Sequence, residues 1–144
     1  MNISLIIPIK NDYDVYVNLC SAINLQTYQP KEIIFIDSSN DNEIENYLIK
    51  KIKISNVNYI KKDKKFPGEA RNIGIKEAKY DYVAFLDSKT IPDANWLFEQ
   101  KEKLIKDKLD VVFGNTKYIS KTKFQHDIKS ATFGNISHIT TPGT

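Results

Sequence analysis

The stretch that decides the fold runs from Phe66 to Leu97, FPGEARNIGIKEAKYDYVAFLDSKTIPDANWL. Within it, Tyr82 to Leu86 is a short apolar run of aromatic and β-branched character, which predicts a strand that is covered on both faces. The run ends at Asp87. Ligands of open α/β sheets bind outside the carboxyl ends of the strands, which favours a ligand-binding role for this acid. The alternative, that Asp87 only caps the turn of residues 88–90, is equally compatible with this stretch alone.

The rest of the chain predicts strands and helices in alternation. Apolar runs of strand length are found at residues 3–9, 31–36, 57–60, 82–86 and 110–114. Apolar residues at helical spacing predict helices that begin after the capping residues 11–14, near 44, near 67 and near 93, with ends near 29, 48, 78 and 108. Alternating elements of these lengths indicate crossover connections and a Rossmann-like, mostly parallel sheet with helices on both faces.

Two of the predicted helices carry a distinct inner face. The third helix places the small residues Ala70, Gly74 and Ala78 on one side, which allows a close approach to the sheet. In the fourth helix, we expect the apolar residues to face inward, namely Trp96, Leu97, Leu104 and Ile105.

Composition limits the class of protein. The chain has 144 residues, 41% of them hydrophobic and 27% charged, which is ordinary for a globular domain. No apolar run approaches the roughly 20 residues of a transmembrane helix, and the first residues lack the features of a signal peptide. The single cysteine, Cys20, excludes an internal disulfide, fits a reducing compartment and predicts a cytoplasmic protein in which this thiol belongs to the core. The net charge of +3 comes with lysines rather than arginines or interleaved aromatics, so no nucleic-acid partner is predicted.

The pattern weakens after residue 117. Residues 124–133 are compatible with a helix, and the last residues, 139–144, suggest no element of their own. We therefore expect residues 1–118 to form one domain, and residues 119–144 to be the incomplete beginning of a second portion of a truncated fold.

Polar residues follow three of the predicted strands and indicate the kind of ligand. The chain has neither a Gly-x-Gly-x-x-Gly dinucleotide fingerprint after the first strand nor a Walker-type phosphate loop. The strand ends instead carry carboxylates, hydroxyls and lysines: Lys10, Asn11, Asp12; Asp37, Ser38, Ser39; Asp87, Ser88, Lys89. Carboxylates accept hydrogen bonds from the N–H of a base and the O–H of a ribose, and a lysine faces phosphate as a point charge. This set suits a nucleoside diphosphate.

Four motifs in this order resemble the family-2 glycosyltransferases of the GT-A fold. They are the first strand with Pro8 and Asn11, IDSSND at residues 36–41, GEARNIGI at 68–75 and YVAFLDSKTIPDANWL at 82–97. The resemblance covers about residues 3–118. It implies a nucleotide-diphosphate sugar as donor, a UDP- or GDP-sugar, and inverting transfer to a hydroxyl of an acceptor saccharide or lipid-linked glycan, in polysaccharide or glycan synthesis. It also implies a divalent metal ion, Mn²⁺ or Mg²⁺.

The resemblance also implies a set of residues that bind the donor. Pro8 and the residues after it would line the base pocket, Asp37 would contact the base, and Arg71 would lie near the base and the phosphates. Asp87 would open the family's Asp-x-Asp motif near the ribose and the metal. The full set that we expect to bind the nucleotide sugar is Pro8, Lys10, Asn11, Asp37, Ser39, Gly68, Arg71, Asp87, Ser88 and Lys89, with Asp87 as the one metal ligand.

The chain departs from the family pattern at three places. Lys89 stands where the family usually has the second, metal-binding acid, so we expect donor binding to depend little on Mn²⁺ or Mg²⁺. Lys10 stands where an aromatic residue often stacks on the base. No acid after Gly114 matches the family's catalytic base, and we do not assign that role to Asp127.

Three alternatives follow from the departures. The chain is a glycosyltransferase domain that is inactive or weakly active alone, a non-catalytic nucleotide-binding or interaction module with a degenerate Asp-x-Asp motif, or a flavodoxin-like or receiver domain. The receiver alternative fails because Asp12 and Asp37 do not supply the paired acids and the phosphorylated aspartate that a receiver needs. No transmembrane segment is predicted, and contact with a membrane surface stays open.

Overall fold

The computed structural model describes residues 1–11, 13–40, 44–117 and 122–125. The chain divides into two compact units, Met1–Glu102 and Lys103–Thr144. The domain boundary predicted at residue 118 and most of the helix predicted at residues 124–133 lie outside the described residues. No helix in the described ranges has the length and apolar character needed to cross a bilayer.

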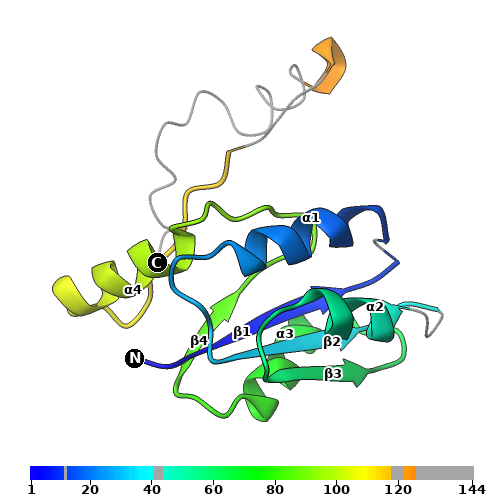
Figure 1. The fold of residues 1–144 in the computed structure, drawn as a ribbon, viewed down its shortest axis with the longest axis horizontal. Helices are drawn as coiled ribbons and strands as arrows, with labels where there is room; N and C mark the ends of the chain where they lie inside the picture. The colour runs from blue at the N-terminus through cyan, green and yellow to red at the C-terminus, as the bar shows by residue number, and fades with distance from the viewer. Residues whose placement is uncertain (12, 41–43, 118–121, 126–144) are drawn as a thin grey trace. The chain divides into compact units, whose positions relative to one another are not determined.

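Four parallel strands form the sheet of the first unit. The elements follow one another as β1 (Ile3–Ile9), α1 (Tyr13–Asn24), β2 (Glu32–Asp37), α2 (Ile44–Lys51), β3 (Val57–Lys61), α3 (Pro67–Glu77), β4 (Tyr82–Phe85) and α4 (Trp96–Lys106). The strand order is β3-β2-β1-β4, and β1 pairs in parallel with both β2 and β4 (Figure 1). The predicted Rossmann-like fold with a parallel sheet is confirmed.

Helices cover both faces of the sheet. Along β2, Ile33 and Phe35 point into the core under α1 and α2, whereas Ile34 and Ile36 point into a second core under α3. This alternation follows from the period of two in a strand, and it explains why β2 is apolar at nearly every position. Figure 1 shows α1 and α2 on one side of the strands and α3 on the other.

The inner face of α1 is the one that the sequence predicts. Tyr16, Leu19, Cys20 and Ile23 are all buried in the core against β1 and β2. Burial raises the pKa of the Cys20 thiol to about 11, so this cysteine is a protonated core residue at neutral pH. The helix ends at Asn24, earlier than the predicted end near residue 29.

A glycine brings α3 close to the sheet. The helix begins at Pro67, and the Glu69 side chain accepts a hydrogen bond of 3.0 Å from the backbone N–H of Phe66, in front of the helix. At Gly74, a Cβ atom would lie 2.4 Å from Cγ2 of Ile6 on β1. The predicted small-residue face is therefore the contact surface between α3 and the strands β1 and β2.

The strand in the deciding stretch is less buried than its sequence predicts. β4 is an edge strand, paired only with β1 within the described sheet, and its residues Tyr82, Val83 and Phe85 are 37–48% exposed. The expectation of a strand covered on both faces was wrong. An apolar run predicts burial, but it does not say whether a strand lies in the centre of a sheet or at its edge.

The strand predicted at residues 110–114 is absent. The described residues 111–117 have no regular structure, and Val111 and Phe113 are more than 60% exposed. A strand needs a neighbour to complete its backbone hydrogen bonds, and the apolar pattern alone does not supply one. In α4, Leu97 is buried as predicted, but Ile105 is 54% exposed instead of facing inward.

Candidate functional site

The loops after β1 and β2 are tied together at the carboxyl end of the sheet. The backbone N–H of Ser38 donates to the carbonyl of Ile9 over 3.0 Å, and the N–H of Asn11 donates to Oγ of Ser39 over 2.8 Å. The Asn11 side chain in turn accepts from the N–H of Asn40 over 3.1 Å. Asn11 has a φ of 51°, a left-handed conformation that asparagine tolerates better than most residues. The structure thus brings Asn11 and Ser39 into direct contact.

Asp37 is the centre of a buried polar cluster. Its carboxylate is fully buried and accepts hydrogen bonds from Nζ of Lys61 (2.8 Å), from the backbone N–H of Ser39 (2.8 Å) and from the hydroxyl of Tyr59. Burial alone would raise the pKa of this carboxyl, but the bonds from Lys61, Ser39 and Tyr59 outweigh it and lower the pKa below its ordinary value. Burial and the bond to Asp37 raise the pKa of Tyr59. Asp37 is therefore an ionised carboxylate that receives donors from three residues.

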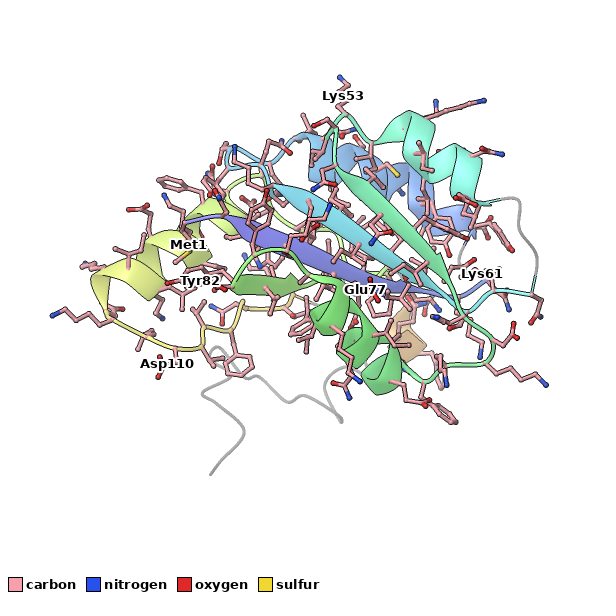
Figure 2. All side chains as sticks on the ribbon, turned by 90° about the horizontal axis from the view of Figure 1, so that it is seen from below. Met1, Lys53, Lys61, Glu77, Tyr82 and Asp110 are labelled. Atoms are coloured by element: carbon pink, nitrogen blue, oxygen red, sulfur yellow. The ribbon has the colours of Figure 1, made fainter. Side chains whose placement is uncertain are left out.

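Strand register places the partners of Asp37. In the pairing of β2 with β3, Asp37 lies directly opposite Lys61 and Phe35 opposite Tyr59, so all four side chains belong to one face of the sheet. Figure 2 shows Lys61 at one end of the sheet and Tyr82, the first residue of β4, at the other. Tyr59 and Lys61 were not among the predicted site residues. Their sequence does show that Val57, Tyr59 and Lys61 alternate along one strand and so share a face. This pattern identifies them as partners of Asp37 only when the register of β3 against β2 is known.

A polar groove opens beside this cluster. It has a volume of about 600 Å³ and is lined by Ser38, Ser39, Asn40, Lys61, Asp63 and Lys64. Ser38 is 5% exposed, and its Oγ has no hydrogen-bond partner among the described residues. A buried hydroxyl without a partner is unusual in a folded protein and indicates a group that is completed from outside.

An ion pair lies on the face of the sheet that α3 covers, opposite the face of the Asp37 cluster. Arg71 of α3 forms an ion pair with Asp87, which follows β4. The Asp87 side chain is 62% exposed, so this pair contributes at most about 1 kcal/mol to stability. The backbone carbonyl of Asp87 also accepts the turn hydrogen bond from the N–H of Thr90, over 2.9 Å.

The remaining predicted site residues lie around these two groups. Pro8 is half-buried on β1, and Lys10 after the strand is exposed. Gly68 lies in the first turn of α3, with open space where a Cβ would be. After β4, Ser88 is buried and Lys89 is exposed. Asp12 lies outside the described residues.

The described donor atoms do not fit a resident divalent ion. Within the described ranges, no three His, Cys, Asp or Glu side chains gather in a way that could hold a metal. Asp87 is engaged by Arg71, and Lys89 adds a positive charge two residues further on. A hard cation prefers several oxygen ligands, which this set lacks.

Gln26 fastens the segment that follows Asp87. Its amide is buried after α1, donates to the carbonyl of Asp93 over 2.7 Å and accepts from the N–H of Leu97 over 3.1 Å. Thr27 adds a backbone bond of 2.9 Å to the carbonyl of Ala94. These bonds fix the path of the chain between the end of β4 and α4. A lone glutamine has no sequence signature, so this residue could not have been singled out.

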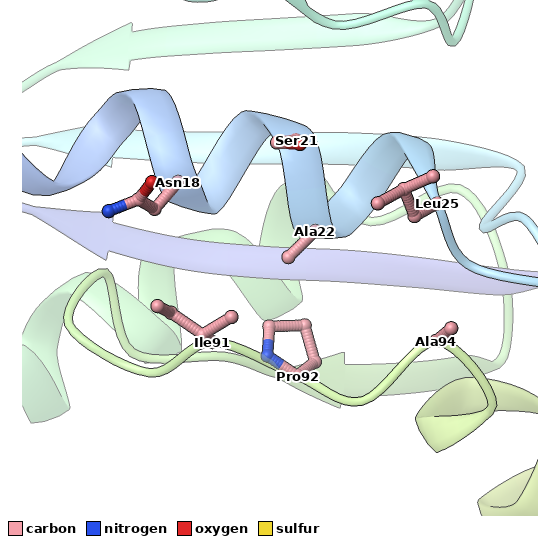
Figure 3. Close-up of a pocket in the computed structure, with 7 residues that line it drawn as sticks. All are labelled: Asn18, Ser21, Ala22, Leu25, Ile91, Pro92 and Ala94. Carbon is pink, nitrogen blue, oxygen red and sulfur yellow. The ribbon is translucent and has the colours of Figure 1, made fainter. Parts of the chain in front are cut away.

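An apolar groove lies between α1 and this segment (Figure 3). Its volume is about 270 Å³, and it is lined by Asn18, Ser21, Ala22, Leu25, Ile91, Pro92 and Ala94. None of the predicted site residues borders it. This groove is therefore not part of the candidate site.

Comparisons with known proteins agree on one family. The sequence model of Glycosyl transferase family 2 matches residues 4–140. Poly-beta-1,6-N-acetyl-D-glucosamine synthase of Staphylococcus aureus is 33% identical over 138 residues, which are 93% of this chain and 33% of that protein. Chondroitin synthase of Escherichia coli is 31% identical over 124 residues, 84% of this chain and 18% of that protein. The chain therefore spans a third or less of the length of these relatives.

Solved structures share the fold. S. aureus TarS 1-349 in complex with UDP-GlcNAc has a TM-score of 0.64 at 22% identity and covers 85% of this chain, which matches 38% of that chain. Mannosyltransferase PcManGT from Pyrobaculum calidifontis, in complex with GDP-Man and Mn²⁺, has a TM-score of 0.61 at 16% identity, with coverage of 72% of this chain and 32% of that chain. The likeness confirms the predicted GT-A type of sheet.

Proposed function

The chain belongs to glycosyl transferase family 2, and we propose that the carboxyl end of its sheet binds a nucleotide-diphosphate sugar as the donor for inverting transfer to a hydroxyl. The observation that carries this proposal is the gathering of hydroxyls, amides, carboxylates and cations at the ends of β1, β2 and β4, whose parallel directions bring them to one edge.

Each polar group has a part in the proposal. Asn11 and Ser39 would border the base together with Pro8 and Lys10. Asp37 would hold Ser39 in place through the hydrogen bond that it accepts from the Ser39 N–H. Arg71 and Asp87 would face the diphosphate and the ribose, because a guanidinium pairs with phosphate oxygens and a carboxylate accepts from ribose hydroxyls. The predicted site residues Gly68, Ser88 and Lys89 would complete the phosphate side.

The acceptor and the metal belong to the proposal as well. The acceptor would be a saccharide or a lipid-linked glycan in polysaccharide or glycan synthesis, as the names of the synthase relatives suggest, with contact at a membrane surface for a lipid-linked acceptor. Because Lys89 replaces an acid, donor binding would depend little on Mn²⁺ or Mg²⁺. The free core thiol of Cys20 supports a cytoplasmic location.

Titration calorimetry with UDP and GDP tests the donor site. We expect at least one of them to bind, and Arg71→Ala to weaken this binding by about tenfold or more, which is about 1.4 kcal/mol. Lys76→Ala is the matched control, since it removes the same charge from the exposed last turn of the same helix. Binding that is equally weak in both variants would mean that only net charge matters. A folded chain that binds neither nucleotide would contradict the proposal.

A second candidate function is a non-catalytic nucleotide-binding module. It is favoured by Lys89 in the place of the second motif acid. Comparing the affinity for a nucleotide sugar with that for the nucleotide alone distinguishes the two candidates. A transferase domain should bind a UDP- or GDP-sugar at least as tightly as the nucleotide, whereas in a nucleotide-binding module the sugar should not increase the affinity.

A further inference from the structure

The connection between β3 and α3 exposes a phenylalanine among lysines. Phe66 is 77% exposed, the largest value among the large hydrophobic residues that the structure describes. It follows Lys64 and Lys65 and directly precedes Pro67, the first residue of α3. A single exposed apolar side chain is common on protein surfaces, so its exposure alone carries no function. The residues around it decide whether this surface has a partner.

Two residues of this connection are disfavoured by its local structure. Phe66 occupies the N-cap of α3 and makes no side-chain hydrogen bond to the helix, although serine, threonine, aspartate and asparagine are preferred at that place. Lys64 has a φ of 40°, a left-handed conformation that favours glycine or asparagine. Residues that neither the turn nor the helix start explains are expected where a surface has a function. The aromatic ring and the ammonium group therefore indicate a contact outside this chain.

The charge around Phe66 is positive. Lys62 and Lys64 are exposed, and Lys65 lies 3.5 Å from Glu69 in an exposed ion pair that adds little to stability. Asp63 is the one acid among residues 61–66. An anionic membrane surface attracts lysines, and an aromatic side chain beside them can enter the boundary between the headgroups and the acyl chains. Lysines around an exposed aromatic ring therefore fit the surface of an anionic membrane.

The connection lies at the carboxyl end of the sheet, beside the proposed donor site. β3 ends at Lys61, and Lys61 and Lys64 line the polar groove together with Ser38 and Ser39. Figure 1 shows the connection leaving the carboxyl end of β3. A membrane that covers this end would bring lipid-linked molecules to the edge where the donor is proposed to bind. A single-stranded nucleic acid fits less well, because it stacks on several aromatic residues along a basic groove, and this connection offers one.

We propose that residues 62–66, the docking loop, hold the chain on a membrane of anionic lipids. Lys62, Lys64 and Lys65 lie against the headgroups, and the ring of Phe66 enters the interface. The role of this contact is to keep the donor site at the surface that carries a lipid-linked acceptor. That role rests on the proposed function, whereas the contact itself rests on the docking loop alone.

Sedimentation with lipid vesicles tests the docking loop. The chain should bind vesicles of phosphatidylglycerol and phosphatidylcholine in equal parts about tenfold more tightly than vesicles of phosphatidylcholine alone. Raising the salt concentration from about 0.1 M to about 0.5 M should weaken this binding, because salt screens exposed charges. Saturating UDP should leave the binding unchanged, since no residue of the docking loop belongs to the proposed donor-binding set.

Two variants remove the two kinds of chemistry in the docking loop. Phe66→Ser should weaken vesicle binding by about fivefold without harm to the fold, because serine is preferred at a helix N-cap. Lys62→Gln/Lys65→Gln should weaken it by about tenfold or more, since each lysine near an anionic surface contributes about fivefold. Circular dichroism and the affinity for UDP show whether both variants are folded.

The amino end of the sheet supplies matched controls. Lys50→Gln/Lys53→Gln removes the same charge from the end of α2 and the segment before β3, and Figure 2 shows Lys53 away from Lys61. Leu25→Ser replaces an apolar side chain that is 66% exposed after α1. Neither variant should change vesicle binding, because α1 and α2 run from the carboxyl end of the sheet back to its amino end.

Four results would overturn the proposal. Equal binding to both kinds of vesicle would exclude docking on anionic lipid. Weaker binding in Lys62→Gln/Lys65→Gln but not in Phe66→Ser would make the loop a site for soluble polyanions such as RNA. An equal loss in the amino-end controls would mean that only net charge matters. Release by UDP would place the lipid headgroup in the donor site.

Failure of the docking is distinguishable from failure of the proposed function. A chain that binds UDP by calorimetry but binds no vesicle would remove the docking loop and leave the donor site in place. A chain that binds vesicles through Phe66 and the lysines but binds no nucleotide would confirm the docking and contradict the proposed function.

Discussion

Replacing Gly74 with alanine should lower the free energy of unfolding by about 1–2 kcal/mol. In an exposed helix interior, the same change stabilises by about 0.5–1 kcal/mol, because alanine restricts the unfolded chain and favours the helix. Here the new Cβ would lie 2.4, 3.2 and 3.3 Å from three carbons of Ile6. Ile6 is fully buried and β-branched, so it cannot turn away, and overpacking of this kind costs about 1–3 kcal/mol. At such a short distance the upper part of that range applies, so the cost of overpacking exceeds the stabilisation by alanine and the variant is destabilised.

Urea unfolding followed by circular dichroism measures the effect, with a double-mutant cycle to identify its cause. Ile6→Ala removes the three carbons that the new Cβ would meet, at a cost of about 2–5 kcal/mol by itself. The double variant should then be about 2–3 kcal/mol more stable than the sum of the single changes, because the overpacking is absent when residue 6 is alanine. Gly68→Ala is the control, because nothing lies within 4 Å of its Cβ position, and it should change stability by less than about 0.5 kcal/mol. Unchanged stability of Gly74→Ala, or strict additivity in the cycle, would refute the close approach of α3 to β1.

Three further predictions concern the candidate site and its support. Gln26→Leu should destabilise the chain by about 1–3 kcal/mol, because it leaves the N–H of Leu97 and the carbonyl of Asp93 without their buried partner. Gln26→Glu keeps the acceptor for Leu97 but sets a buried carboxylate oxygen against the carbonyl of Asp93, so it should lose at least as much in the same urea experiment at neutral pH. The pKa of Asp37 is lowered in the folded state, so this carboxylate stabilises the fold fully above its ordinary pKa of 3.8, and the stabilisation is lost as the pH falls from 3.8 towards the folded-state pKa. Asp37→Asn should therefore reduce the dependence of the free energy of unfolding on pH between about pH 5 and 2. An unchanged pH dependence would contradict the hydrogen bonds that Asp37 accepts from Lys61, Ser39 and Tyr59. In the Lys89→Asp variant, addition of Mn²⁺ should make UDP binding about tenfold tighter, whereas the affinity of the unmodified chain for UDP should increase by less than this. A tenfold increase in the unmodified chain would show that Lys89 does not replace the metal.

Local patterns account for the parts of the fold that were predicted correctly. The apolar runs of β1 and β2 and the helical spacing on α1 depend on neighbours within one element, so they are visible in the sequence. The small face of α3 was predicted for the same reason, since Ala70 and Gly74 lie one turn apart. The alternation of these elements then led to the parallel sheet, because a crossover connection between parallel strands leaves few topologies.

Long-range pairing accounts for the parts that were wrong or missed. The apolar run at residues 110–114 resembles those of β1 and β2, but its state depends on whether a neighbouring strand is present. The exposure of Tyr82 on β4 likewise depends on the order of the strands and not on its own sequence. Lys61 became a partner of Asp37 through the register of β3 against β2, which no local pattern encodes.

The strand order also separates the two acids of the candidate site. Asp37 follows β2 and belongs to the face of α1 and α2, whereas Asp87 follows β4 and pairs with Arg71 of α3 on the other face. β1 runs between β2 and β4, so the two strand ends are two inter-strand spacings apart, about 10 Å. A ligand that reaches both acids must therefore pass over the end of β1. Lys10 and Asn11, which follow β1, therefore lie in the middle of the proposed site. A nucleoside diphosphate, with its base and phosphates at opposite ends, is long enough to extend from the end of β2 to the end of β4.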